Sequence, residues 1–367
     1  MTTLLESRLE EHATPTAPHV RLAPHLLDCL RCPGCSTDGP LVQDVRAHGA
    51  EVVSCTHCGS TYDHPDRILN LSNTAHSANP VFEQEFDDWE HNAEHYIHEP
   101  NSPLYQLLHT RKTKTFGITG CDAPIVLDLG AGTGYFSHYL ANLGCHPVTL
   151  DFSPKMLQAG MKSYDLPAAV LYATPPLPFR SESFDAVIAN GMLHHCKAQG
   201  ALGAVLSEIH RVLKPGGMLY VFDRNGAWAG RCLHHFVLRI KELMQNRLTA
   251  SASASRHEPD FMLDDLQSVL DAGFRIQRQR HISTLPTFAT IVATNTLKYA
   301  GWPRLASTCQ TLARPLLGIL EQGLAARCFT VEQCLCLSKT TPESANERRV
   351  PESTTPRAVR TNRGRHT

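Results

Sequence analysis

The sequence predicts an α/β protein whose doubly wound, mostly parallel sheet is covered by helices, with a small cysteine-rich module near the N-terminus. Two observations carry this prediction. Short apolar runs typical of strands alternate with amphipathic segments typical of helices between residues 125 and 284. Two Cys-x-x-Cys pairs, separated by 19 residues, precede that alternation. In such parallel sheets ligands bind at the carboxyl ends of the strands.

Length and composition fit this architecture. At 367 residues the chain is long enough for two domains, or for one large domain with an appendage. A hydrophobic content of 42% and a charged content of 19% are typical of a globular protein with a sizeable core. The formal net charge of −1 gives no overall attraction to nucleic acid or to an acidic membrane.

The number and distribution of cysteines and the composition of the N-terminal segment indicate the cellular compartment of the protein. Residues 1–24, predicted to be disordered, contain Glu6, Glu10 and Glu11 and no apolar core of the signal-peptide type. No run of 18 apolar residues occurs, so no transmembrane segment is expected. The 13 cysteines are odd in number, with five of them between residues 29 and 58. This distribution favours reduced thiols and a metal over disulfides, and with it a cytoplasmic protein.

The two Cys-x-x-Cys pairs predict a structural Zn²⁺ site. Each pair can form a tight knuckle, and two knuckles supply the four thiolates of a tetrahedron. The predicted ligands are Cys32, Cys35, Cys55 and Cys58. Cys29 forms a competing Cys-x-x-Cys pair with Cys32, but leucines flank it, so we interpret it as a packed apolar residue.

The segment around these cysteines predicts a zinc ribbon over residues 25–75. Leu26-Leu-Asp28, both knuckles, Tyr62 and Ile68-Leu-Asn-Leu71 resemble the zinc-ribbon family that includes the small activator subunit of tRNA and protein methyltransferases. The resemblance implies a structural role or docking to a protein. Asp66-Arg67 stands where that family has a glycine-containing turn.

A ribbon of this kind also raises the alternative of RNA binding. Residues 25–75 contain three basic residues and six acidic ones. Phosphate binding requires clustered Lys and Arg, so nucleic acid is an unlikely partner.

A strand, a glycine turn and a helix follow one another from residue 126 to residue 144. The strand 126–129 runs into Gly130, Gly132 and Gly134, and apolar residues then recur at helical spacing. Glycines let a ligand approach the backbone at the N-terminus of the helix. The dinucleotide fingerprint would need its third glycine at Tyr135. The next strand ends at Asp151, an acid that can accept both hydroxyls of a ribose.

The remaining elements complete the alternation. Helices are expected at 199–213 and 263–272. Strands are expected at 125–129, 146–151, 168–172, 184–190, 218–223, 274–284 and 329–338.

Several motifs recur in a fixed order along residues 101–340. Asp128 with the Gly-x-Gly-x-Gly turn is followed by 177–179, 183–190, 193–195 and 211–217. This order resembles the class I S-adenosylmethionine (SAM)-dependent methyltransferase family, in the branch with quinone and sterol methyltransferases. The resemblance implies a Rossmann-like, seven-stranded sheet with an antiparallel last strand. It also implies SAM as cofactor and a small-molecule acceptor, with a hydrophobic metabolite as one option.

The resemblance assigns roles to individual residues. Asp128 supports the turn and the amino group of SAM, Asp151 holds the ribose hydroxyls, and Phe152 lies against the adenine. Asn190 ends the fourth strand near the transferred methyl group. The turn at the methionine end consists of Gly130, Ala131, Gly132 and Gly134. Ala173 is a departure, since relatives place an acid there to receive the adenine amino group.

His194 and His195 follow the fourth strand and are the candidate catalytic bases. Histidine titrates near neutrality and can take a proton from a hydroxyl. The alternative is that this dipeptide serves packing only.

The flanking segments complete the domain organisation. Residues 76–100 are predicted to be a linker and an acidic cap helix over the cofactor. Helical insertions are expected at 224–260 and 285–328, as lids or as surface helices that touch lipid. Residues 341–367 are expected to be a disordered tail. Two alternative functions remain. The first is an RNA methyltransferase that binds RNA through its zinc ribbon, and the second is a SAM-binding, non-catalytic scaffold or activator.

Overall fold

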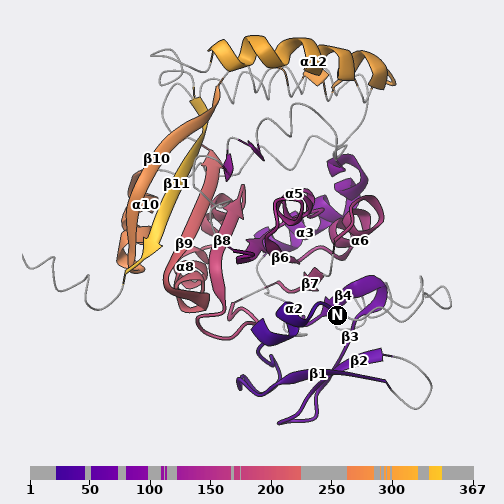
Figure 1. The fold of residues 1–367 in the computed structure, drawn as a ribbon, viewed down its shortest axis with the longest axis vertical. Coiled ribbons are helices and arrows are strands. Elements are labelled where there is room, and N and C mark those ends of the chain that lie inside the picture. Colours follow the sequence, from indigo (N-terminus) through magenta and orange to yellow (C-terminus); the bar gives the residue numbers. More distant parts are fainter. Residues whose placement is uncertain are drawn as a thin grey trace, which may run out of the picture.

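The fold was analysed in a computed structural model (Figure 1). The structure describes residues 22–45, 51–72, 80–97, 122–166, 169–173, 175–224, 263–284, 300–320 and 330–340, with short stretches between 109 and 113 and between 290 and 297. The expected disordered segments at 1–21 and 341–367 lie outside the described residues, as does the insertion at 225–260.

A central sheet organises the main domain. Its strands stand in the order β10-β11-β9-β8-β5-β6-β7-β4. The pairs from β9 to β4 are parallel, and β11 runs antiparallel to both β9 and β10, which confirms the predicted reversal of the last strand. The strands are β4 (Ile68–Asn70), β5 (Ile125–Leu129), β6 (His146–Asp151), β7 (Ala169–Leu171), β8 (Phe184–Asn190), β9 (Leu213–Arg224), β10 (Phe274–Thr284) and β11 (Thr330–Lys339).

The sheet contains one strand more than the seven predicted. Ile68 pairs with Ala169 and Asn70 with Leu171, so β4 extends the sheet at its β7 edge. From the sequence, Ile68-Leu-Asn-Leu71 is expected in the zinc ribbon, because it is part of the resemblance to that family. The end of the ribbon segment is therefore part of the main domain.

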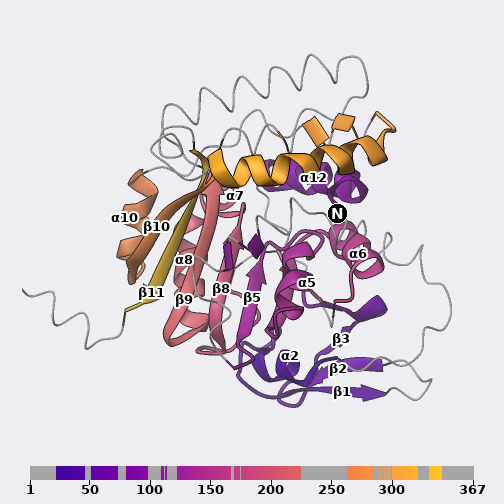
Figure 2. The same ribbon diagram turned by 45° about the horizontal axis from the view of Figure 1, so that its top comes forward.

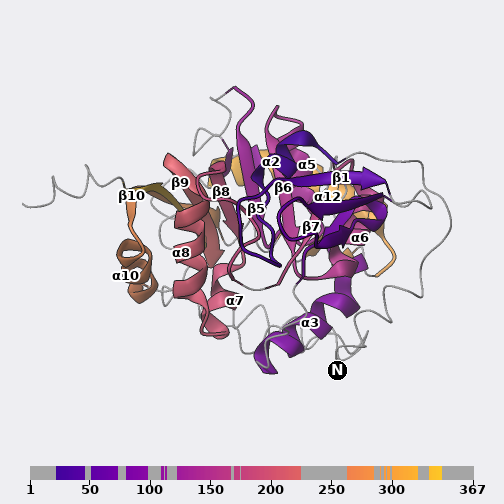
Figure 3. The same cartoon turned by 90° about the horizontal axis from the view of Figure 1, so that it is seen from below.

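Helices cover the two faces of the sheet because neighbouring residues of a strand point to opposite sides. Val126 packs with Phe136 of α5 (Tyr135–Ala141), whereas Leu127 packs with the core that contains α8 (Leu202–Val212). Figure 3 shows α8 and α10 (Leu263–Asp271) on one side of the strands. The helix predicted at 199–213 starts later, because α7 (Leu193–Ala198) precedes it and Gly200 has φ +71°.

The N-terminal module is a small antiparallel sheet with one helix. Its strands are β1 (Leu41–Val45), β2 (Glu51–Cys55) and β3 (Thr61–Asp63), preceded by α2 (Pro24–Cys29). A short 3₁₀ helix, η1 (Pro65–Arg67), leads into β4. Leu22 lies within the segment predicted to be disordered, but it is buried and its backbone N–H donates to Gln43 Oε1 at 2.9 Å.

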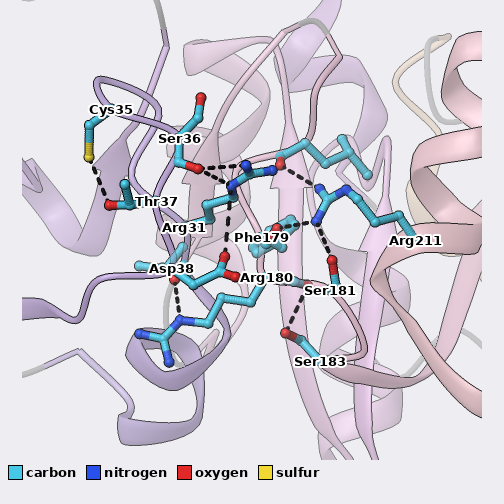
Figure 4. Close-up of polar contacts among 12 residues, drawn as sticks. Arg31, Cys35, Ser36, Thr37, Asp38, Phe179, Arg180, Ser181, Ser183 and Arg211 are labelled. Atoms are coloured by element: carbon cyan, nitrogen blue, oxygen red, sulfur yellow. Dashed lines mark hydrogen bonds and ion pairs between the residues drawn. The ribbon is translucent and has the colours of Figure 1, made fainter.

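This module docks on the edge of the main sheet where the parallel strands begin, which we call the amino edge. The backbone N–H of Arg180 donates to Cys29 O at 2.8 Å, and its Nε donates to Leu30 O at 2.9 Å. Arg31 is fixed beside it by Ser36 O, and Arg211 donates to Phe179 O at 2.7 Å (Figure 4). Leu30, Phe179 and the sheet residues form one continuous core.

The opposite edge, where β5, β6, β8 and β9 end, is called the carboxyl edge. The predicted cap helix is present there as α3 (Pro80–Asn92), which continues into the 3₁₀ helix η2 (Ala93–Tyr96). Within the second predicted insertion, α12 (Pro303–Leu320) is helical. Figure 2 shows α12 at one end of the molecule and β1 to β3 at the other. Among the described residues, no helix has the length and apolarity needed to cross a membrane.

Candidate functional site

The glycine turn after β5 leaves no room for side chains. Gly130 and Gly134 have φ values of +68° and +72°, in the left-handed region that favours glycine. A Cβ on Gly134 would lie 2.7 Å from Leu166 Cδ1, and one on Gly130 would lie 2.9 Å from Met192 Cβ. Glycine is therefore required at both positions by backbone conformation and by packing.

Two buried carboxylates hold this turn in place. Ser137 Oγ donates to Asp128 Oδ2 at 2.7 Å, and Asp151 accepts from the backbone N–H groups of Gly132 at 2.7 Å and Ser153 at 2.9 Å. Burial raises the pKa of Asp128 to about 6 and also raises the pKa of Asp151. Asp151 thus fixes the glycine turn in addition to its expected role toward a ribose.

A pocket opens between these residues and the cap helix. The predicted cofactor residues Gly130, Asp151 and Phe152 line it, together with Ala173. Most of its other walls are apolar, formed by Phe82, Leu129, Leu150, Tyr172, Pro175, Leu177, Met192, Cys196, Ala201 and Val205. The ring of Phe152 lies 5.4 Å from that of Phe82 on α3. An apolar slot with one buried acid suits a flat base attached to a ribose.

The position of Ala173 agrees with the departure noted in the sequence. It lines the pocket but provides no acid for an adenine amino group. The neighbouring Thr174 lies outside the described residues. Gln199 is a polar side chain that lines the same pocket, and its amide donates to Glu85 Oε2 at 2.7 Å.

A buried lysine that the sequence analysis missed lies beside Asn190. Lys112 Nζ donates to Asn190 Oδ1 at 2.7 Å and lies 4.6 Å from the centre of the Phe222 ring. Lys112 is buried, and its charge also acts on Asp128. The end of β8 therefore combines an amide with a cation. No motif marks Lys112 in the sequence, because it lies 78 residues before Asn190.

The two candidate histidines have different partners. The Nδ1 atom of His194 lies 2.7 Å from Asp223 Oδ1, and both side chains are buried. The Nδ1 atom of His195 lies 3.1 Å from Glu85 Oε1 on α3, and the His195 side chain keeps 15% of its surface exposed. The ring centres of the two histidines are 4.1 Å apart. Neither partner was predicted, since they lie 29 and 110 residues away in the sequence.

Glu90 joins the cap helix to the site. It is buried, and its Oε1 accepts from Ser153 Oγ at 2.6 Å and from the Lys155 N–H at 3.0 Å. Both donors belong to the N-terminus of α6 (Pro154–Ser163), where a carboxylate is favourable. The helix that covers the pocket is thus anchored directly behind Asp151.

The four predicted metal ligands converge at the other end of the molecule. The Sγ atoms of Cys32, Cys35, Cys55 and Cys58 all lie within 4.8 Å of one another. Four thiols at such separations match the donor set and the spacing of a tetrahedral zinc site. The Cys29 thiol lies apart from them, 3.9 Å from Ser183 O, and burial raises its pKa to about 11. This position agrees with the interpretation of Cys29 as a packed residue.

Comparison with known proteins gives a consistent result. A family model described as a methyltransferase domain matches residues 127–221. A demethylmenaquinone methyltransferase of Streptomyces avermitilis is 31% identical over 183 residues, which cover 49% of this chain and 69% of that protein. A probable tRNA methyltransferase 9B of Homo sapiens is 27% identical over 131 residues, covering 35% of this chain and 28% of that protein.

A solved structure shows a fold likeness at low similarity. It is the 1,6-didemethyltoxoflavin-N1-methyltransferase of Burkholderia thailandensis with bound 1,6-didemethyltoxoflavin and S-adenosylhomocysteine. Its identity to this chain is 14%, with a TM-score of 0.41 and coverage of 82% of this chain and 99% of that one. At this score nothing further rests on the likeness.

Proposed function

Because this chain belongs to the class I SAM-dependent methyltransferases, we propose that it transfers the methyl group of SAM to a small-molecule metabolite, and that this acceptor is hydrophobic. The observation that carries the proposal is the convergence at the carboxyl edge of the glycine turn, through Gly130, and a buried Asp151, both lining one apolar pocket. Such a pocket at the ends of parallel strands is where this sheet type binds its ligands.

The residues present fit the cofactor. Asp151 and Phe152 would hold the ribose and the adenine, and the turn at 130–134 would face the methionine part. Asp128 would receive the amino group, and Lys112 has the charge needed for the carboxylate. When bound, SAM supplies an activated methyl group, so the protein has mainly to align the acceptor and exclude water.

The charge of Asp128 predicts a pH dependence of cofactor binding. Its pKa of about 6 means that the carboxyl group is protonated below that pH and must lose a proton to pair with an ammonium group. Asp151 and Lys112 are the charged groups that also act on it. We expect the Kd for S-adenosylhomocysteine to be constant above pH 6 and to rise about tenfold per pH unit below it. Calorimetry between pH 5 and pH 7.5 checks this. Asp128→Asn should bind weakly without the pH dependence, and a flat wild-type profile would contradict the assignment.

For proton removal we propose His195, with Glu85 as the group that positions its ring. His194 is buried against Asp223 and serves to hold the start of α7 on β9. We expect His195→Asn to lower kcat by about 100-fold or more, as loss of a general base does, and to leave the Kd for S-adenosylhomocysteine unchanged. Glu85→Gln should shift the acid limb of the pH–rate profile. The matched variant His194→Asn should instead lower the Tm, because the buried carboxylate of Asp223 loses its imidazole partner. Equal kcat values for wild type and His195→Asn would exclude His195 as the base.

The small-molecule acceptor is favoured over RNA by charge and position. The relative from Streptomyces is named for methylation of demethylmenaquinone, whereas the human relative is named for tRNA. In this chain the ribbon carries more acids than bases and docks at the amino edge, away from the pocket. We therefore propose that its four thiolates bind a structural Zn²⁺ and that any docking through this module is to a protein.

A transfer assay tests the proposal and separates it from a scaffold role. Zinc-loaded protein is incubated with [methyl-³H]SAM and either a panel of hydrophobic phenols and quinols or bulk RNA. We expect label in the organic-soluble metabolite fraction and none above background in RNA. Label retained on RNA would favour the RNA methyltransferase. Tight binding of S-adenosylhomocysteine without turnover on any class of acceptor would favour the scaffold.

A further inference from the structure

Exposed apolar side chains gather at the carboxyl edge of the molecule. α12 carries most of them: Leu305, Leu312 and Leu316 are 45%, 72% and 58% exposed, and Trp302, just before the helix, is 60% exposed. Tyr96 and Ile97, at the end of the cap segment, are also exposed. Large apolar side chains in such number on one side mark an interaction surface.

These positions of α12 form one stripe. Residues 305, 309, 312 and 316 recur at helical spacing, and Cys309 between the leucines is half-buried. The side of α12 that packs on the protein is different, since Ala306, Gln310 and Leu317 are buried. The stripe is therefore a second apolar side of the helix, additional to the one that holds it in place.

The strand register puts this stripe at the same edge as the candidate site. Thr284, the last residue of β10, pairs with Thr330, the first residue of β11. Glu332 pairs in turn with Arg224, at the end of β9. The insertion that contains α12 thus leaves and re-enters the sheet at the carboxyl edge. Tyr96 reaches that edge too, because its carbonyl accepts from Thr133 Oγ1 of the glycine turn at 3.4 Å.

Charge indicates the nature of the surface that α12 meets. The helix has two arginines, Arg304 and Arg314, and no acidic residue along its 18 residues. Arg304 is exposed close to Trp302 and Leu305. An apolar stripe with leucines, a tryptophan at one end and only cationic charges is the composition of helices that lie in the interface of anionic membranes.

We propose that the stripe of Trp302, Leu305, Leu312 and Leu316 docks this protein on an anionic lipid bilayer, with the exposed side of α12 facing the membrane. The docking does not depend on methyl transfer or on the cofactor. It explains why a helix that is already packed on the protein keeps a second apolar side exposed. A second copy of the chain is the competing occupant, and the experiment distinguishes the two.

The test is co-sedimentation of the full-length, zinc-loaded protein with vesicles. We expect binding to vesicles of equal parts phosphatidylglycerol and phosphatidylcholine, and about tenfold weaker binding to phosphatidylcholine alone or at high salt. Leu312→Glu/Leu316→Glu should lower binding about tenfold or more. The matched control is Ser307→Glu/Thr311→Glu, which adds the same charge to exposed positions of α12 off the stripe and should retain most of the binding.

The variants are accepted only if they keep the wild-type circular dichroism and affinity for S-adenosylhomocysteine. As a second readout, brominated lipid should quench the part of the fluorescence that Trp302→Phe removes. Absence of wild-type binding to both vesicle types would overturn the proposal. Equal loss of binding in the control variant would also overturn it, since charge alone would then explain the binding. A dimer in sedimentation velocity that the leucine variant dissociates, without vesicle binding by wild type, would assign the stripe to a second copy.

Discussion

Replacing Asp151 with alanine is expected to abolish measurable binding of S-adenosylhomocysteine. The carboxylate accepts from the N–H groups of Gly132 and Ser153, at 2.7 and 2.9 Å, inside a buried environment. Its removal leaves these two backbone donors without their acceptor. Loss of a hydrogen bond to a charged group costs about 1.5–3 kcal/mol of stability, so the turn should leave the geometry that binds the cofactor. We therefore expect the Kd to rise about 100-fold or more.

The proposed contact to the ribose adds to that loss. Asp151→Asn retains one carbonyl oxygen for Ser153 but presents an amide to the Gly132 N–H, so it should bind the cofactor more weakly than wild type and better than Asp151→Ala. Glu83→Ala, an exposed acid on the cap helix, is the control and should leave the Kd unchanged. Isothermal titration calorimetry with a parallel measurement of Tm separates binding from folding. Binding by Asp151→Ala within about threefold of wild type would remove Asp151 from the site.

The sequence alone was sufficient to predict those features of the fold and the site that depend on a few neighbouring residues. The strands around the glycine turn matched closely, because Val126 to Leu129 and Val148 to Leu150 are buried on both faces and are apolar apart from Asp128 and Thr149. The glycine turn could also be predicted from local sequence. A positive φ and close packing leave little choice of residue other than glycine. The convergence of the four cysteines proposed as metal ligands could be predicted because knuckle spacing is local.

The sequence alone was insufficient to predict features that depend on contacts between residues far apart in the chain. His195 gave no sign that Glu85 would lie beside it, and Asn190 gave none of Lys112. These partners come from the segment before the glycine turn, which carries no motif. The pairing of β4 with β7 was not predicted for a related reason: it depends on packing against residues about 100 positions away, and not on the three residues of β4 itself.

Loss of one zinc ligand is expected to destabilise the whole protein and not only its N-terminal module. Cys32 and Cys55 are buried in the same continuous core as Leu30, Phe179 and the central strands. A structural zinc contributes folding free energy directly, on the order of 10 kcal/mol in isolated fingers. Local unfolding of the module reduces the loss of folding free energy in the rest of the protein. We therefore expect Cys55→Ser to lower the Tm by about 10 °C. Bound zinc should fall from one equivalent to none.

Cys29→Ala is the matched control, because Cys29 is buried in the same core but its thiol lies outside the metal-binding set. It should keep one equivalent of zinc and lose only about 1 kcal/mol, as a small cavity in a core does. Below its Tm, Cys55→Ser should still bind S-adenosylhomocysteine, since the pocket lies at the opposite edge of the sheet from the thiols. Zinc measured by mass spectrometry and Tm measured by calorimetry decide the matter. Full zinc occupancy in Cys55→Ser would contradict the proposed ligand set. Zinc loss with an unchanged Tm would show that the N-terminal module does not stabilise the main domain, although it packs on Phe179 and Arg180.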